Sequence, residues 1–219
     1  MFDKFLRLPK ERILEPIARG PMKNVSPTAV TIVACGVALA AGGTASQGLY
    51  SVTLGLWLFN RFLDGLDGTI ARINHKQSDF GGYLDIVLDM IAYIAIPLGM
   101  AFSVGTMAVF VTLSIMFAIF YLNSASWMML SAYLEKRNAG AMLKGELTSV
   151  TMPRAIMEGA ESIVTYSLFI LLPAYLPLLF SIMAGLVFLS AIWQIRWAHV
   201  LLNKKRKNEQ RIPGKQTLA

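Results

Sequence analysis

The sequence predicts an all-α fold, a polytopic membrane bundle of six transmembrane helices with an interfacial amphipathic helix at the N-terminus. The 219 residues are 55% hydrophobic and only 15% charged, which is far from the composition of a soluble domain. Apolar runs of about 20 residues, the length that crosses the hydrocarbon core, recur along the chain. The connections between these runs alternate between ones that carry Lys or Arg and ones that carry neither, as expected for a multi-pass protein.

The N-terminal segment, residues 1–20, reads MFDKFLRLPKERILEPIARG. Its apolar residues alternate with basic ones at spacings that suit a helix lying in the membrane interface, with a break near Pro9. A signal peptide is not expected, because charges interrupt every apolar run and no small-residue cleavage site follows.

Six apolar runs follow, and each is long enough to span a membrane. They lie at 27–47, 50–70, 82–103, 106–134, 154–174 and 177–202. Because they occupy most of the chain, we predict a single membrane domain over residues 1–203, followed by a polar, basic cytoplasmic tail over 204–219. The single cysteine, Cys35, allows no intramolecular disulfide and is expected to pack between helices.

Orientation follows from the basic residues, which precede the first run, follow the second, separate the fourth from the fifth and follow the sixth. The connections near 47, 104 and 175 carry no Lys or Arg. The positive-inside rule therefore places both termini, and the connection after the second run, in the cytoplasm. The net charge of +7 suits an anionic membrane surface. No nucleic acid is expected as a partner, since the basic residues are spread over four short segments.

Five aspartates lie within the stretch DGLDGTIARINHKQSDFGGYLDIVLD, residues 64–89. An aspartate near the membrane centre costs roughly 2.5–3.5 kcal/mol, so this clustering requires an explanation. At helical spacing, the polar and small residues of the stretch fall on two stripes: Asp64, Asp67, Gly68, Ala71 and Arg72 on the first, and Gly81, Asp85 and Asp89 on the second. Two antiparallel helices joined by a short loop would therefore turn four carboxylates toward one another at the cytoplasmic end.

Four carboxylates cannot stay ionised together in a low-dielectric cleft without cations. Oxygen ligands suit Mg²⁺, Mn²⁺ or Ca²⁺, and the scarcity of Cys and His argues against zinc. Because Mg²⁺ is usually shared between carboxylates and substrate phosphates, the pattern indicates phosphoryl chemistry. The small residues between the acids would leave room for a ligand against the backbone, although close helix packing is an alternative explanation.

The order Asp-x-x-Asp-Gly-x-x-Ala-Arg, eight residues, Gly-x-x-x-Asp-x-x-x-Asp is complete in this chain. It resembles the signature of the CDP-alcohol phosphotransferases, and the segment NVSPTAVT is similar to the Pro-x-x-x-Thr pattern that opens the first span in that family. The resemblance implies an enzyme that transfers a phosphatidyl group from a CDP-linked lipid, such as CDP-diacylglycerol, to the hydroxyl of a small polar alcohol and releases CMP. It also implies a bacterial or archaeal inner membrane as the location.

The resemblance implies a role for each motif residue. Asp64, Asp67 and Asp85 would be ligands of a site for two Mg²⁺ or Mn²⁺ ions, with Asp85 also catalytic, and Asp89 would be the general base and lie among the metal-binding residues. Contacts with the CDP-linked donor are implied for Gly68, Ala71, Arg72, Ser78, Gly81, Pro27 and Thr31. The implied partners are the donor lipid, the alcohol acceptor and the bilayer, with a homodimer left open.

Polar residues in the later spans are candidates for acceptor binding. They are Asn123, Arg154, Glu158, Glu161 and Arg196, with Lys144 and Arg137 as further basic residues. The arginines and lysine suit a phosphorylated acceptor, whereas the glutamates suit a polyol or a cationic amino alcohol, and both alternatives stay open. An Arg154 to Glu158 pair that merely closes a helix end is the structural alternative.

Two functions from other classes remain. An ion-coupled transporter also places acids in its spans, but its sites usually lie near the midplane on broken helices. A non-catalytic membrane scaffold has little reason to keep four aspartates in register. Release of CMP from a CDP-linked lipid would distinguish the enzyme from both.

Overall fold

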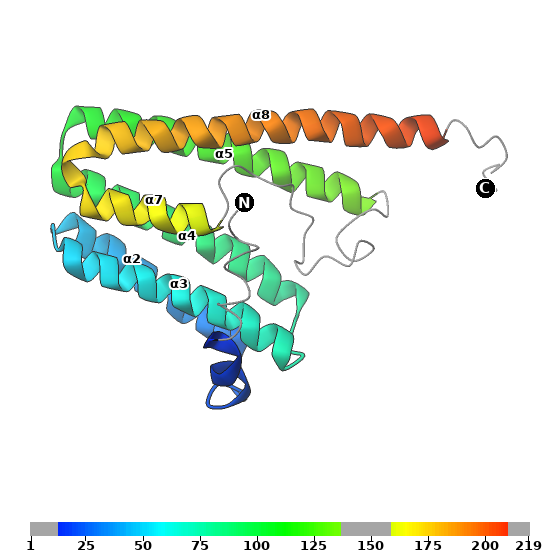
Figure 1. Cartoon of the computed structure of the whole chain (residues 1–219), viewed down its shortest axis with the longest axis horizontal. Helices are drawn as coiled ribbons and strands as arrows, with labels where there is room; N and C mark the ends of the chain where they lie inside the picture. The colour runs from blue at the N-terminus through cyan, green and yellow to red at the C-terminus, as the bar shows by residue number, and fades with distance from the viewer. Residues whose placement is uncertain (1–12, 137–158, 210–219) are drawn as a thin grey trace.

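The computed structural model describes residues 13–136 and 159–209, and within these ranges the chain forms helices and short turns with no strand (Figure 1). Residues 13–19 are helical. The elements that follow are α2 (Pro27–Ser46), α3 (Tyr50–Ile73), α4 (Asp79–Val104), α5 (Met107–Lys136), α7 (Gly159–Leu171), the 3₁₀ turn η1 (Pro173–Tyr175) and α8 (Leu176–Glu209). The predicted all-α class is confirmed, and α8 continues beyond Lys204 into the segment predicted as a tail.

Four of the described segments are long and apolar enough to cross a membrane: α2, α4, most of α5, and Pro173–Leu202. Helix α3 has 24 residues but carries several charges, and α7 is described over only 13 residues. The six-span count and the interfacial position of the N-terminal helix therefore stay predictions.

Local chemistry sets the ends of the two helices that carry the motif aspartates. Ser78 caps α4, because its Oγ accepts a hydrogen bond from the backbone N–H of Gly81 at 3.1 Å. The other end of α4 stops at Gly105, whose φ of 68° is a conformation that glycine adopts without strain. Asp79, the third of the five aspartates in the stretch 64–89, is the first residue of α4.

Helix α2 packs on both α3 and α4, and its contact with α4 is very close. A Cβ atom added to Gly42 would lie 2.7 Å from the carbonyl oxygen of Ala95, and one added to Gly99 would overlap the carbonyl oxygen of Gly42. Small residues permit such backbone approach between membrane helices. Helices α3 and α4 both rest on α2 rather than closely on each other, which leaves room between their facing sides.

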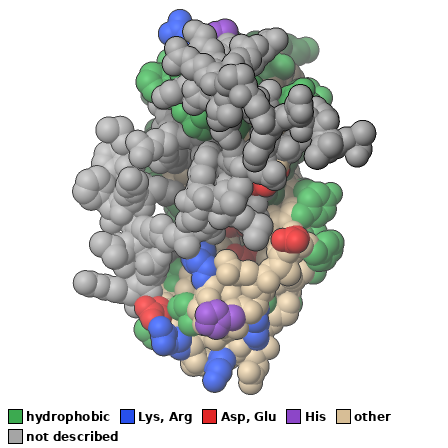
Figure 2. Space-filling view, turned by 90° about the vertical axis from the view of Figure 1, so that its right-hand side faces the viewer, with side chains coloured by type: hydrophobic (Ala, Val, Ile, Leu, Met, Phe, Trp, Pro, Cys, Tyr) green, Lys and Arg blue, Asp and Glu red, His purple; other side chains and the backbone are tan. Residues whose placement is uncertain are grey.

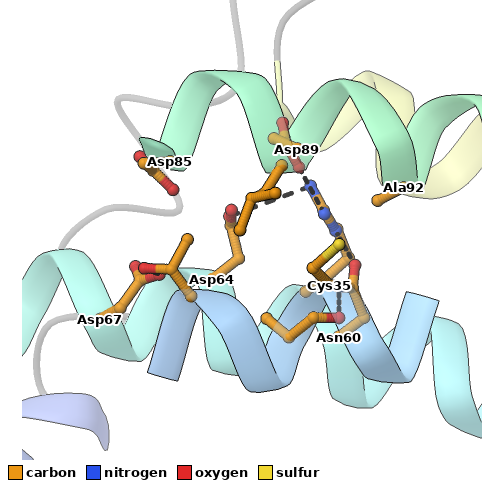
Figure 3. A pocket seen from close by; sticks show the side chains of 11 residues that line it. Cys35, Asn60, Asp64, Asp67, Asp85, Asp89 and Ala92 are labelled. Carbon is orange, nitrogen blue, oxygen red and sulfur yellow. Dashed lines mark hydrogen bonds and ion pairs between the residues drawn. The ribbon is translucent and has the colours of Figure 1, made fainter. Parts of the chain in front are cut away.

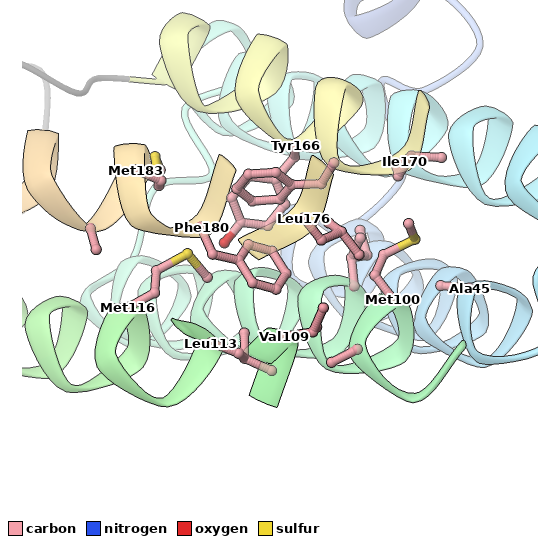
Figure 4. Packing of buried hydrophobic residues seen from close by; sticks show 14 of the residues in the cluster. Ala45, Met100, Val109, Leu113, Met116, Tyr166, Ile170, Leu176, Phe180 and Met183 are labelled. Atoms are coloured by element: carbon pink, nitrogen blue, oxygen red, sulfur yellow. The ribbon is translucent and has the colours of Figure 1, made fainter. Parts of the chain in front are cut away.

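The largest apolar core joins the paired helices α5 and α8 to α7 (Figure 4). The ring of Phe169 in α7 meets that of Phe180 in α8 edge-on, with 4.9 Å between centroids. Met100 of α4 is buried in the same cluster. Helix α7 thus lies between the α5–α8 pair and the helices that carry the aspartates (Figure 1).

An aromatic group fixes α7 to both motif helices. Trp57 of α3 stacks on Tyr166 of α7 with centroids 5.1 Å apart, and its Nε1 donates to the carbonyl oxygen of Ile163 at 3.3 Å. The hydroxyl of Tyr166 donates to the carbonyl oxygen of Tyr93 in α4 at 2.8 Å. The distance between α3 and α4 is therefore fixed by the contacts that α7 makes with both helices, as well as by the packing of both helices on α2.

Candidate functional site

A pocket lies between α3 and α4, with α2 forming its third wall (Figure 3). We call it the carboxylate pocket. Its lining residues are Thr31, Ala34, Cys35, Asn60, Arg61, Asp64, Asp67, Asp85, Leu88, Asp89 and Ala92. The structure thus brings together the four aspartates that helical spacing placed on two facing stripes, and charged side chains gather at the same end of the molecule (Figure 2).

Asp67 is the most buried of the four aspartates, with 4% of its surface exposed. Thr31 donates from Oγ1 to Asp67 Oδ2 at 2.7 Å, and the backbone N–H of Gly68 donates to Oδ1 at 2.5 Å. Both donors are neutral, so they orient the carboxylate without cancelling its charge. Thr31 was predicted to contact the CDP-linked lipid. In the structure its hydroxyl instead positions the carboxylate of Asp67.

Asp89 is paired with Arg61, a residue that the sequence analysis did not single out. Arg61 Nη2 donates to Asp89 Oδ1 at 2.5 Å, and Nη1 lies 3.9 Å from Asp64 Oδ2. The sequence did contain a signal, because Arg61 lies three residues before Asp64 and thus on the same helical stripe. A basic residue inside an apolar helix is a functional candidate by default.

Asp85 on α4 faces Asp64 and Asp67 across the pocket, with Asp89 one turn further along the same helix (Figure 3). Among residues 13–136 and 159–209, no group of three His, Cys, Asp or Glu side chains is gathered tightly enough to hold a metal ion by itself. The donor chemistry fits Mg²⁺ or Mn²⁺ nonetheless, because such ions commonly take one or two carboxylates and complete their shell with water and substrate phosphates. The metal-ligand set stays a prediction.

The residues expected to bind the donor have different surroundings. A Cβ added to Gly68 would meet only the guanidinium of Arg72, at 3.1 Å from Nη1. One added to Gly81 would lie 2.9 Å from Ser78 Oγ, so Gly81 and Ser78 already serve the cap of α4. Pro27 begins α2, where its fixed φ suits the first helical position. Gly68 is thus a motif glycine whose open side faces a flexible side chain and no backbone atom.

Of the acceptor candidates that the structure describes, Asn123, Glu161 and Arg196, none lines the carboxylate pocket. Arg154, Glu158, Lys144 and Arg137 lie outside the described residues. Asn123 of α5 is half-buried and its Oδ1 has no hydrogen-bond partner within the described part of the chain. Glu161 of α7 is half-buried and Arg196 of α8 is exposed. The acceptor pocket stays a prediction.

Thr31 provides a test of how Asp67 is positioned. For the CMP release that the family resemblance implies, we expect Thr31→Val to lower the turnover number about tenfold, because a neutral donor to a charged group contributes roughly 1.5–3 kcal/mol and valine keeps the shape without the hydroxyl. Thr44→Val is the matched control, since Thr44 lies on the same helix and bonds to Thr53, 2.9 Å away, rather than to an aspartate. Equal turnover in the two variants would show that the Thr31 hydroxyl does not matter for Asp67.

Helices long enough to span a membrane and an acid-lined pocket at one end define a multi-pass membrane protein. The chain belongs to the CDP-alcohol phosphatidyltransferase family, which it matches over residues 24–202. It is 28% identical over 189 residues to the inner membrane protein YnjF of Escherichia coli strain K12, covering 85% of this chain and 88% of that protein.

The fold is similar to crystal structures of the Mycobacterium tuberculosis phosphatidylinositol phosphate synthase PgsA1. The structure of PgsA1 with CDP-DAG bound matches with a TM-score of 0.64 and 19% identity, covering 95% of this chain and 99% of PgsA1. The structure in complex with manganese and citrate matches with a TM-score of 0.59 and 17% identity, covering 93% and 92%. At this level of identity the likeness concerns the fold.

Proposed function

We propose that the protein is a divalent-metal-dependent phospholipid-synthesising enzyme that transfers a phosphatidyl group from CDP-diacylglycerol, or a similar CDP-linked lipid, to the hydroxyl of a small polar alcohol. The observation that carries the proposal is the carboxylate pocket, where Asp64, Asp67, Asp85 and Asp89 meet in a chain of this family. The bound CDP-DAG and manganese in the PgsA1 structures support the choice of donor and metal.

In this proposal Asp64, Asp67 and Asp85 would hold Mg²⁺ or Mn²⁺, in a site for two ions. Bound there, the metal would supply positive charge to offset the negative charge of the donor's diphosphate. Asp89 accepts the proton of the acceptor's hydroxyl as the hydroxyl oxygen attacks the phosphorus that bears the diacylglycerol. The new O–P bond forms as the P–O bond to the CMP phosphate breaks, and CMP leaves with that electron pair.

The donor would lie along the stripe of small and basic residues on α3. Gly68 and Ala71 leave space against the backbone, and the Arg72 side chain beside Gly68 offers positive charge to a phosphate. The basic residues that flank the helices at this end support a site on the cytoplasmic side. Membership of the family favours this enzyme over a transporter or scaffold.

The acceptor is proposed to be a small polyol or its phosphate, bound by residues of the later helices such as Asn123, Glu161 and Arg196. The decisive experiment incubates purified protein, CDP-diacylglycerol and Mn²⁺ with glycerol 3-phosphate, inositol, inositol phosphate, serine, ethanolamine or choline. We expect CMP release with one polyol or polyol phosphate, and mass spectrometry of the lipid identifies it.

Other outcomes separate the parts of the proposal. If CDP-diacylglycerol is inert but another CDP-alcohol reacts, the donor assignment is wrong and the reaction class stands. A preference for serine, ethanolamine or choline contradicts the polyol assignment alone. Absence of CMP release from every CDP-alcohol, in protein that stays folded and binds Mn²⁺, contradicts the enzyme.

A further inference from the structure

Helix α4 contains a proline, Pro97, within its buried part. Proline has no backbone N–H, so the helical hydrogen bond from residue 97 to the carbonyl oxygen of Tyr93 cannot form. Inside a membrane protein a carbonyl freed in this way is commonly satisfied by a neighbouring helix. Here the hydroxyl of Tyr166 in α7 donates to the carbonyl oxygen of Tyr93 at 2.8 Å. A side chain of another helix therefore replaces the bond that Pro97 removes.

The Tyr166 side chain is itself held in place on both sides. It is fully buried, its ring stacks on Trp57 of α3, and it lies 5.1 Å from the ring of Phe169. These rings leave the hydroxyl little freedom to turn away from α4. The break in α4 is therefore bridged from a fixed point on α7.

The two parts of α4 on either side of this break differ in how firmly they are packed. Residues 79–91, which we call the acid-bearing part because they include Asp85 and Asp89, contain no buried residue. Residues 98–104, the anchored part, include Gly99, whose backbone meets that of Gly42 so closely that no side chain would fit. Met100 in the anchored part also belongs to the largest apolar core. Any bending of α4 at Pro97 would therefore move the acid-bearing part.

The carboxylate pocket is narrow. Its cavity has a volume of about 10 Å³, which is about the space that one water molecule requires. A diphosphate is larger, so α3 and the acid-bearing part of α4 have to move apart for the donor to lie between the carboxylates. Helices bend most readily at a proline, and Pro97 lies about two turns beyond Asp89.

We infer that Pro97 is a hinge in α4 and that Tyr166 is the positioning residue that holds this hinge closed. While Tyr166 bonds to the carbonyl of Tyr93, the acid-bearing part keeps its aspartates facing α3. When this bond breaks, the acid-bearing part moves about Pro97 and the pocket widens for the CDP-linked lipid. The choice of this lipid rests on the proposed function, whereas the hinge can be tested without it.

The first test measures hydrogen–deuterium exchange of the backbone amides by mass spectrometry on the detergent-solubilised full chain. Tyr166→Phe removes only the hydroxyl, and it should raise exchange in the acid-bearing part roughly tenfold, because an unpaired buried carbonyl favours the open form. Exchange in the anchored part should stay within about twofold. Tyr50→Phe is the matched control, since the Tyr50 hydroxyl bonds to Ser103 at 2.8 Å, on the anchored side of Pro97. It should leave the acid-bearing part unchanged.

The second test restores the missing N–H with Pro97→Ala. The carbonyl of Tyr93 then regains its helical partner. In this background Tyr166→Phe should change exchange in the acid-bearing part by less than about twofold, a coupling that a double-mutant cycle quantifies.

Kinetics separate positioning from a general loss of stability. Tyr166→Phe should lower turnover about fivefold with KM for CDP-diacylglycerol within about twofold, because the aspartates are held less precisely. Pro97→Ala should instead raise this KM about fivefold, because a continuous helix resists opening. The double variant should recover the turnover that Tyr166→Phe loses. A residue that only stabilised the fold would lower the amount of folded protein and leave both constants unchanged.

Three results would overturn the inference. One is equal exchange in Tyr166→Phe and Tyr50→Phe, or a rise spread over both parts of α4, and this comparison does not need Pro97→Ala to fold. Another is an effect of Tyr166→Phe that is as large in the Pro97→Ala background as in the wild type. The third is a wild type that releases CMP while Pro97→Ala leaves KM unchanged. If exchange behaves as expected but the wild type releases no CMP from any CDP-alcohol, the hinge stands and the proposed function fails.

Discussion

Asp85→Asn is expected to lower the rate of CMP release at least about 100-fold, because loss of a metal-binding carboxylate removes charge stabilisation from the transition state. The amide keeps the size of the side chain, and Asp85 is only half-buried on α4, so the fold should be retained. The measurement is CMP release at saturating CDP-diacylglycerol and Mn²⁺, with thermal unfolding recorded for the same preparation. Chelation of divalent ions should abolish the wild-type activity to the same extent.

Asp79→Asn is the matched control. Asp79 is the first residue of the same helix and is exposed, outside the carboxylate pocket. Its loss removes only a favourable charge at a helix N-terminus, worth about 0.3–1 kcal/mol, and turnover should stay close to that of the wild type. Near-normal turnover of a well-folded Asp85→Asn variant would show that the carboxylate is not needed, and the assignment of the pocket would be wrong.

The sequence could predict the two aspartate stripes because helical periodicity is a local property. Asp64 and Asp67 share a face of α3, and Asp85 and Asp89 a face of α4, whatever the rest of the chain does. The short loop between the helices turns these faces toward each other. The apolar runs predicted at 27–47 and 82–103 agree closely with α2 and α4, because apolar length is also a local property of the chain.

The contacts that orient the aspartates could not be predicted in the same way. The Arg61–Asp89 bond joins residues 28 apart and the Thr31–Asp67 bond residues 36 apart. Both depend on the register between helices, which is set by side-chain packing such as the close approach of Gly42 and Gly99. The sequence places Arg61 on the acid stripe but does not show which carboxylate it reaches.

A motif position can also serve the helix rather than the ligand. The family resemblance implies that Ser78 binds the CDP-linked lipid. In the structure its hydroxyl oxygen accepts a hydrogen bond from the backbone N–H of Gly81 and caps α4. The preference for serine at such caps is a general property of helices. A family resemblance therefore implies a ligand-binding role for a residue such as Ser78, whereas the structure shows the hydrogen bond that its side chain makes.

Gly68→Leu is expected to raise the KM for CDP-diacylglycerol about tenfold or more while leaving the protein folded. The open side of Gly68 faces the movable end of the Arg72 side chain and no backbone atom, so a side chain added there has to displace only the end of a flexible side chain. Leucine is also a better helix former than glycine by about 0.8–1 kcal/mol, and Gly68 is not among the glycines with a positive φ. A loss of donor affinity could then not be ascribed to a weaker helix.

Gly99→Leu is the matched control on α4, and its expected result is the opposite. A side chain at Gly99 would overlap the carbonyl oxygen of Gly42, and since overpacking a tight helix contact costs typically 1–3 kcal/mol, the midpoint of thermal unfolding in detergent should fall. The fraction of Gly99→Leu protein that stays folded should keep a KM close to that of the wild type, because Gly99 lies away from the carboxylate pocket. If Gly68→Leu instead lowered thermal stability as Gly99→Leu does and left KM unchanged, the glycine of the motif would be there for packing, and the donor would have to lie along another face of α3.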